Sequence, residues 1–139
     1  MDDDAARWEA VEEAAELLLE GAHEEALTLL RAAIAGDPKN AYAYFHSGNA
    51  LYELERYAGA VVAFRSALAL SPDYAGARLG LAHALRKVGE PAEALRIAMA
   101  GVTALGEDSD HLYAAALAAE ATGERAPATE LLRRCLATR

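Results

Sequence analysis

The sequence predicts an all-α solenoid built from a repeated helix-turn-helix unit. The chain has 139 residues, and the segment EEALTLLRAAIAGDPKNAYA from Glu24 aligns without gaps with AGAVVAFRSALALSPDYAGA from Ala58. Alanine recurs at the same interval of 34 residues along the chain, at Ala26, Ala60, Ala94 and Ala128. A fixed period of this length is typical of stacked helical repeats, in which each repeat packs against its neighbours.

Residues 41–74 carry the most complete copy of a sequence signature. Its small, aromatic and proline positions are Tyr44, Gly48, Ala60, Phe64, Ala67 and Pro72. Their spacing resembles that of the tetratricopeptide repeat (TPR) family. Further segments resemble copies of this repeat in the same register, at residues 7–40, 75–108 and 109–139. The resemblance implies a single TPR-like domain, 1–139, folded as a right-handed α-solenoid of four helix-turn-helix repeats with eight helices.

Periodicity and helix breakers predict the positions of these helices in order. We expect them near residues 4–20, 24–35, 41–54, 57–70, 75–88, 91–104, 109–121 and 126–138. Gly21, Gly89 and Gly123 follow the first helix of their repeats, where a left-handed residue after the C-terminus favours glycine. Pro91 and Pro127 fall in first turns, where proline costs little.

Glycine inside the predicted helix 41–54 needs a compensating reason, because it costs about 1 kcal/mol relative to alanine. The positions equivalent to Gly48 in the other repeats hold Ala14, Ala82 and Ala116. Since all four residues are small, we expect the second helix of each repeat to cross the first at this position. A larger side chain there should cost on the order of 1–3 kcal/mol. Repeat three, which has Ala98 in place of Phe64, is expected to pack more loosely.

Composition and charge exclude several classes of protein. Hydrophobic residues make up 54% of the chain and charged residues 25%, which argues against intrinsic disorder. The net charge is −9, and the first forty residues hold eleven acids against three bases, so nucleic acid and anionic membranes are disfavoured as partners. A single cysteine, Cys135, excludes an internal disulfide and a cysteine-based zinc site within one chain. No apolar run approaches ~20 residues. We expect a cytoplasmic protein without membrane insertion, although a chain whose signal sequence had been removed would show the same pattern.

A second stripe of helix 41–54, distinct from that of Gly48, predicts a binding surface. The first helices of a curved solenoid line its concave side, and in the TPR family that groove takes an extended peptide or a partner's helix. Asn49 can donate to and accept from a peptide backbone, aromatic side chains offer large contact areas, and Gly76 leaves space for a ligand. The alternative is that the aromatic rings fill space between neighbouring helices. The predicted peptide-binding groove comprises Tyr42, Phe45, His46, Asn49, Tyr52, Glu53, Leu79, His83, Arg86 and Tyr113.

The best-known ligand mode of the TPR family is a clamp of lysines, arginines and asparagines around two carboxylates. Asn49 matches one asparagine of this clamp. Phe45, however, stands where a lysine is expected, and Gly80 stands where the second asparagine is expected. The resemblance therefore disfavours the acidic C-terminal tail of a chaperone as the ligand.

The sequence shows no catalytic arrangement. Ser47 and Ser66 lack the glycine-flanked turn of a nucleophile, and His46 with His83 supplies too few ligands for a metal ion. We therefore predict a non-enzymatic protein-protein interaction adaptor or scaffold that binds an extended peptide or a partner helix. No catalytic residue, metal or cofactor is expected.

Two alternatives remain open. The predicted helix 109–121 carries alanines on a side that no further repeat would cover, which suits a structural assembly subunit that forms a homodimer through its C-terminal end. These alanines are Ala114, Ala115, Ala118 and Ala121. The size, acidity and repeat number also resemble those of secretion-type chaperones. An acidic face on the first helix either binds a basic partner or keeps the exposed end of the repeat array solvated. Its members are Glu9, Glu12, Glu13, Glu16 and Glu20.

Overall fold

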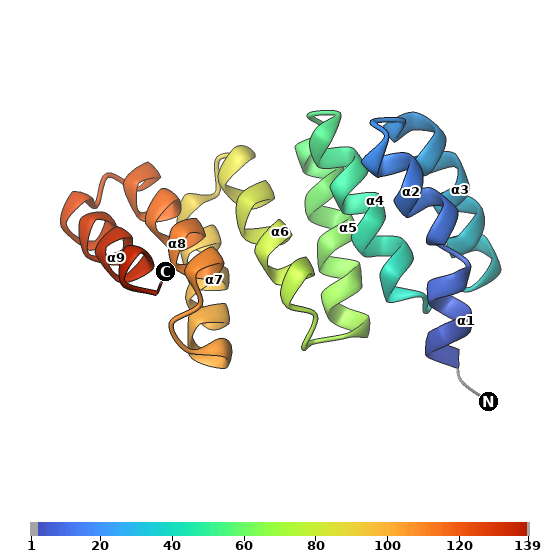
Figure 1. Ribbon diagram of the computed structural model, residues 1–139. Coiled ribbons are helices and arrows are strands. Elements are labelled where there is room, and N and C mark those ends of the chain that lie inside the picture. Colours follow the sequence, from blue (N-terminus) through green and yellow to red (C-terminus); the bar gives the residue numbers. More distant parts are fainter. Residues whose placement is uncertain (1–2, 139) are drawn as a thin grey trace. The chain divides into compact units, whose positions relative to one another are not determined.

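The computed structural model describes residues 3–138, which form nine helices joined by short turns (Figure 1). They are α1 (Asp3–Glu9), α2 (Glu12–Leu19), α3 (His23–Gly36), α4 (Ala41–Glu53), α5 (Tyr57–Leu70), α6 (Ala75–Lys87), α7 (Pro91–Leu105), α8 (Ser109–Ala121) and α9 (Arg125–Ala137). The chain divides into two compact units, Met1–Ala77 and Arg78–Arg139, with the division inside α6. The predicted all-α class is confirmed.

The single helix predicted over residues 4–20 is wrong, because the chain forms α1 and α2 with a turn at residues 10–11. The backbone N–H of Val11 donates to the carbonyl of Trp8 at 3.0 Å, one residue short of α-helical spacing. The carbonyl of Arg7 would accept from Val11 in an uninterrupted helix. It accepts instead from the side-chain amide of Asn40 at 3.0 Å. The described residues therefore hold nine helices rather than eight.

Asn40 is fully buried and ties α1 to the start of α4. Its Oδ1 accepts from the N–H of Ala43 at 3.3 Å and so caps α4, while its Nδ2 donates to Arg7. The Arg7 guanidinium also donates to the carboxylate of Asp37 at 2.7 Å, and this hydrogen bond holds the pKa of Asp37 below its ordinary value. The short α1 is thus fixed by contacts with residues about thirty positions later.

Gly48 lies where α4 crosses α5, as the sequence predicts. A Cβ atom added to Gly48 would lie 2.6–2.8 Å from three ring atoms of Phe64, closer than any ordinary contact. The equivalent residues of the first repeat, Ala14 and Leu30, are both buried in one core cluster. The crossing therefore pairs glycine with phenylalanine in one repeat and alanine with leucine in the other.

The first helix of every repeat ends in the same left-handed turn. Gly21, Gly89 and Gly123 have φ angles of 83°, 85° and 87°, which confirms the prediction for these glycines. The equivalent residue of the second repeat is Glu55, with a φ of 60°. In all four turns, a backbone N–H donates to the carbonyl five residues earlier at 2.8–3.0 Å, the pattern of a Schellman motif.

Repeat three departs from the signature at Ala98, and this residue is nevertheless buried. Ala98 of α7 is fully buried in a cluster with Val102 and Leu112. Gly101 of α7 faces the ring of His111 on α8, and no space remains for a Cβ atom at Gly101. A bulky residue on one helix is again matched by the smallest residue on the other.

The prediction that helix 109–121 exposes a face of four alanines is wrong for three of them. Ala114, Ala115 and Ala118 are buried, because α8 packs between α7 and α9 within the second unit, and only Ala121 is exposed. Cys135 of α9 is a buried core residue.

Candidate functional site

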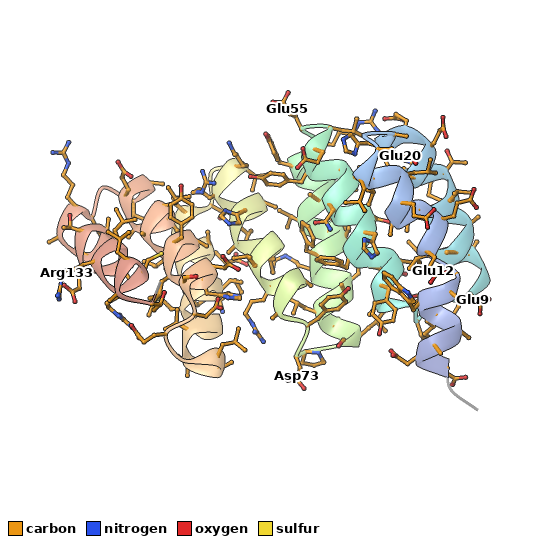
Figure 2. All side chains as sticks on the ribbon, in the orientation of Figure 1. Glu9, Glu12, Glu20, Glu55, Asp73 and Arg133 are labelled. Carbon is orange, nitrogen blue, oxygen red and sulfur yellow. The ribbon has the colours of Figure 1, made fainter. Side chains whose placement is uncertain are left out.

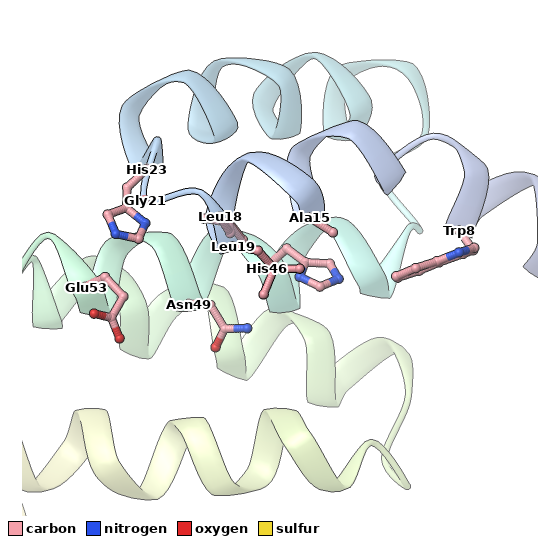
Figure 3. A pocket seen from close by; sticks show the side chains of 9 residues that line it. All are labelled: Trp8, Ala15, Leu18, Leu19, Gly21, His23, His46, Asn49 and Glu53. Atoms are coloured by element: carbon pink, nitrogen blue, oxygen red, sulfur yellow. The ribbon is translucent and has the colours of Figure 1, made fainter.

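A pocket of about 550 Å³ opens on the first unit (Figure 3). Helices α1 and α2 supply an apolar wall, α4 supplies a polar wall, and the turn before α3 lies at one end. The lining residues are Trp8, Ala15, Leu18, Leu19, Gly21, His23, His46, Asn49 and Glu53. The pocket therefore combines apolar area with a few hydrogen-bonding groups, a composition typical of ligand sites.

Helix α4 brings three of the predicted groove residues to this pocket. His46, Asn49 and Glu53 are separated by three and four residues, so they share one stripe of the helix. The cap at Asn40 fixes where α4 begins, and hence which side of the helix this stripe occupies. In Figure 3, Asn49 and Glu53 project from α4 on the side away from α3.

Two imidazole nitrogens at the pocket are buried without a hydrogen-bond partner among the described residues. They are Nε2 of His46 and Nδ1 of His23. Burial lowers the pKa of His46 below its ordinary value, so this ring is neutral near pH 7. A neutral imidazole nitrogen can donate or accept depending on its tautomer, which gives an incoming ligand two groups to pair with.

Phe45, another predicted groove residue, packs inside an aromatic cluster. Its ring lies 4.8 Å from the ring of Tyr74 and 6.0 Å from that of Phe64, measured between centroids. The space expected at Gly76 is wrong, because Phe45 covers it: a Cβ atom there would lie 3.0 Å from the phenyl ring. These contacts favour the packing alternative for Phe45.

Tyr42 and Tyr52 also contact neighbouring aromatic residues. The hydroxyl of Tyr42 donates to the carboxylate of Asp4 at 2.6 Å, and its ring stands edge-on to Trp8 with centroids 5.6 Å apart. Tyr52 stacks edge-on against Tyr57 at 5.1 Å. Tyr42 thereby holds Trp8, a wall of the pocket, in place.

The remaining predicted groove residues lie in the second unit. Leu79 packs against the core of that unit, and Tyr113 is exposed. A guanidinium nitrogen of Arg86 lies 3.4 Å from Nδ1 of His83. Burial, followed by the charge of Arg86, lowers the pKa of His83 below its ordinary value. The structure thus groups His83 with Arg86 and places Leu79 in the packing of the second unit.

Neither a metal-ligand group nor a membrane-spanning helix is found in the part of the chain that the structure describes. Within residues 3–138, no group of three or more His, Cys, Asp or Glu side chains is arranged to hold a metal ion. In the same residues, no helix is both long and apolar enough to cross a membrane.

Comparison with known families decides the classification. Residues 15–54 and 48–89 each match the model of the TPR repeat, and together they span more than half of the chain. The chain belongs to the TPR repeat family. TPR proteins are in general non-catalytic protein-interaction modules, which agrees with a scaffold role for this chain. A comparison with curated proteins gives no significant match.

Solved structures share the TPR fold of this chain along most of its length. MamA 41-end from Desulfovibrio magneticus RS-1 is 25% identical, with a TM-score of 0.83 over 98% of this chain and 76% of that one. A crystal structure of MamA protein is 22% identical, with a TM-score of 0.84 over 91% of this chain and 69% of that one. TTC0263, a thermophilic TPR protein in Thermus thermophilus, is 20% identical, with a TM-score of 0.78 over 94% of this chain and 73% of that one.

Several lining residues of the pocket in this TPR protein are not predictable from the repeat pattern alone. Leu19, Gly21 and His23 were not among the predicted groove residues. The sequence did contain a signal for Leu19. It is an apolar residue next to Glu20 that lies outside the helical stripe of Ala14, so it is not expected to face the same core. Gly21 lies in the turn after α2, and His23 begins α3 directly after that turn, so helical spacing along α2 places neither residue at the pocket.

Proposed function

We propose that this TPR protein is a non-enzymatic adaptor that binds an extended peptide or a helix of a protein partner. The observation that carries the proposal is the pocket between α2 and α4, where an apolar wall faces Asn49 and His46. Asn49 offers both a donor and an acceptor to a peptide backbone. The buried Nε2 of His46 gains a partner when a peptide fills the pocket.

The apolar wall supplies the gain in free energy that binding requires. The side chain of Leu19 is 90% exposed, and Trp8 is also exposed. Covering apolar side chains of this size stabilises a complex by about 25 cal/mol for each Å² removed from water. Their position on helices that pack against α3 and α4 keeps this wall in place before a ligand arrives.

A peptide-display selection against the full chain tests the proposal. Peptides selected on the wild type should lose binding to a Leu19→Asp/Asn49→Ala variant. They should keep binding to Val62→Asp, a matched control at an exposed position of α5 outside the pocket lining. Circular dichroism must show equal helicity for all three proteins. Selected peptides that bind the pocket variant as well as they bind the wild type would overturn the proposal.

A further inference from the structure

The charge around the pocket is strongly one-sided. Among the residues that the structure describes, no lysine or arginine lines the pocket, whereas Glu53 does. On α2 and its C-cap, Glu12, Glu16 and Glu20 are exposed. Glu12 lies three residues from the lining residue Ala15, and Glu16 lies three residues from the lining residue Leu19, so each pair is adjacent on the helix surface. Glu20 directly follows Leu19 at the end of α2. Figure 2 shows Glu9, Glu12 and Glu20 projecting from the outside of the first unit.

Nearby cations do not balance this charge. Arg7 pairs with Asp37 and Arg56 pairs with Glu24, so both are already neutralised by carboxylates. Burial keeps His46 uncharged near pH 7, and the ring adds no positive charge to the wall of the pocket. An apolar surface bordered by unbalanced carboxylates attracts a ligand that carries both apolar and positively charged groups.

We propose that the partner segment bound in this pocket is basic and amphipathic. An apolar side chain of the segment packs between Trp8 and Leu19, and its lysines or arginines lie against Glu12, Glu16, Glu20 and Glu53. The inference rests on the proposed function, because it names the chemistry of the ligand for the same pocket. Both features are needed for recognition. The carboxylates attract any cation but do not define the shape of the ligand, whereas the apolar pocket defines the shape but does not select for charge.

Three synthetic peptides of equal length, all free of tryptophan, test the inference with the full chain. One alternates leucine and lysine on the two faces of a helix, the second replaces lysine with glutamate, and the third replaces leucine with serine. Binding is measured by the anisotropy of labelled peptide and by the fluorescence of Trp8, the single tryptophan of the chain. The leucine–lysine peptide should bind, the leucine–glutamate peptide should not, and the serine–lysine peptide should bind at least about tenfold more weakly.

Variants of the chain then locate the binding. Leu19→Ser and the triple change Glu12→Gln/Glu16→Gln/Glu20→Gln should each weaken the leucine–lysine peptide by about tenfold. The matched control neutralises three exposed glutamates of the second unit and should leave the affinity within about twofold. Its substitutions are Glu90→Gln, Glu120→Gln and Glu124→Gln.

The outcomes separate this inference from the function on which it rests. Binding of the leucine–glutamate peptide that is lost in Leu19→Ser would overturn the basic partner and leave the pocket as a peptide site. Equal effects of the two glutamate triples would overturn the inference, since the attraction would then be non-specific. Leucine–lysine binding that Leu19→Ser leaves unchanged would overturn both, because the pocket would not be where the peptide binds.

Discussion

The pairing of Gly48 with Phe64 makes a quantitative prediction about the core of the first unit. In Gly48→Ala, the new Cβ would meet the phenyl ring at 2.6–2.8 Å, and Phe64 is too deeply buried to move aside freely. Overpacking of this kind costs about 2 kcal/mol, and alanine regains about 1 kcal/mol of helix propensity. The net loss in the free energy of unfolding is therefore about 1 kcal/mol.

The double variant Gly48→Ala/Phe64→Leu recreates the pair that the first repeat uses, Ala14 with Leu30. Phe64→Leu alone leaves unfilled volume and should cost about 1.5 kcal/mol. In the double variant the alanine methyl group enters that volume, while the gain in helix propensity remains. We expect the double variant to lie within about 1 kcal/mol of the wild type, with a coupling of about 1.5 kcal/mol between the two sites.

Urea unfolding followed by the fluorescence of Trp8 measures these values, because this tryptophan lies in the first unit. Gly36→Ala is the matched control: Gly36 ends α3, and apart from its chain neighbours and the backbone of α3 no described atom lies within 4 Å of the Cβ position. This control should be neutral or slightly stabilising. Effects of Gly48→Ala and Phe64→Leu that add within about 0.5 kcal/mol would refute the steric reasoning.

Three other predictions concern stability. Glu55→Gly should raise the free energy of unfolding by about 0.5 kcal/mol, because relief of the left-handed backbone strain outweighs the added entropy of the unfolded chain. Gly21→Glu should lower it by about 1 kcal/mol, because it introduces the same strain. Urea unfolding of both variants checks the two signs, and a loss of stability in Glu55→Gly would contradict the strain at this position. Asn40→Ala should lower the free energy of unfolding by about 2 kcal/mol in the same assay, because the Arg7 carbonyl loses its donor and the Ala43 N–H loses its side-chain acceptor. An unchanged midpoint would contradict the bridging role of Asn40. The free energy of unfolding should fall as the pH drops from 7 to 5. The pKa values of His46 and His83 are lowered in the folded chain, whereas in the unfolded chain they keep the ordinary histidine value near 6.5. As the pH falls, the unfolded chain therefore binds protons first, and the folded chain loses stability relative to it. His46→Gln/His83→Gln should flatten this slope in urea titrations at each pH, and an unchanged slope would contradict the assignment; the lowered carboxyl pKa values of Asp37 and Asp108 act at lower pH.

The features that sequence analysis predicted correctly are those that local chemistry determines. Glycine at Gly21 and proline at Pro91 mark a helix end and a helix start wherever they occur, and the structure places them as expected. The requirement for a small residue at Gly48 also followed from the sequence, because the repeat supplies the same position three more times. Periodicity thus replaced the structural comparison that a single position cannot offer.

The features that it missed depend on contacts distant in the chain. At the break between α1 and α2, the carbonyl of Arg7 accepts from Asn40, and this contact crosses thirty-three positions and leaves no local signal. The burial of Ala118 was missed for a similar reason, since the helical pattern does not say how much of α8 its neighbours cover. In the candidate site, the stripe of His46 and Asn49 was predictable from spacing, whereas the inward position of Phe45 depended on Tyr74 of a later turn.

The bond from Asn40 to Arg7 also sets an order of events during protein synthesis. Helix α1 has seven residues, and an isolated helix of that length is not stable in water. The acceptor at Arg7 leaves the ribosome first, and its donor follows thirty-three residues later. Until then, α1 has neither the amide of Asn40 nor the carboxylate of Asp37 to hold it. Helix α1 therefore becomes ordered only after the start of the second repeat has been made, and one wall of the pocket is completed with it.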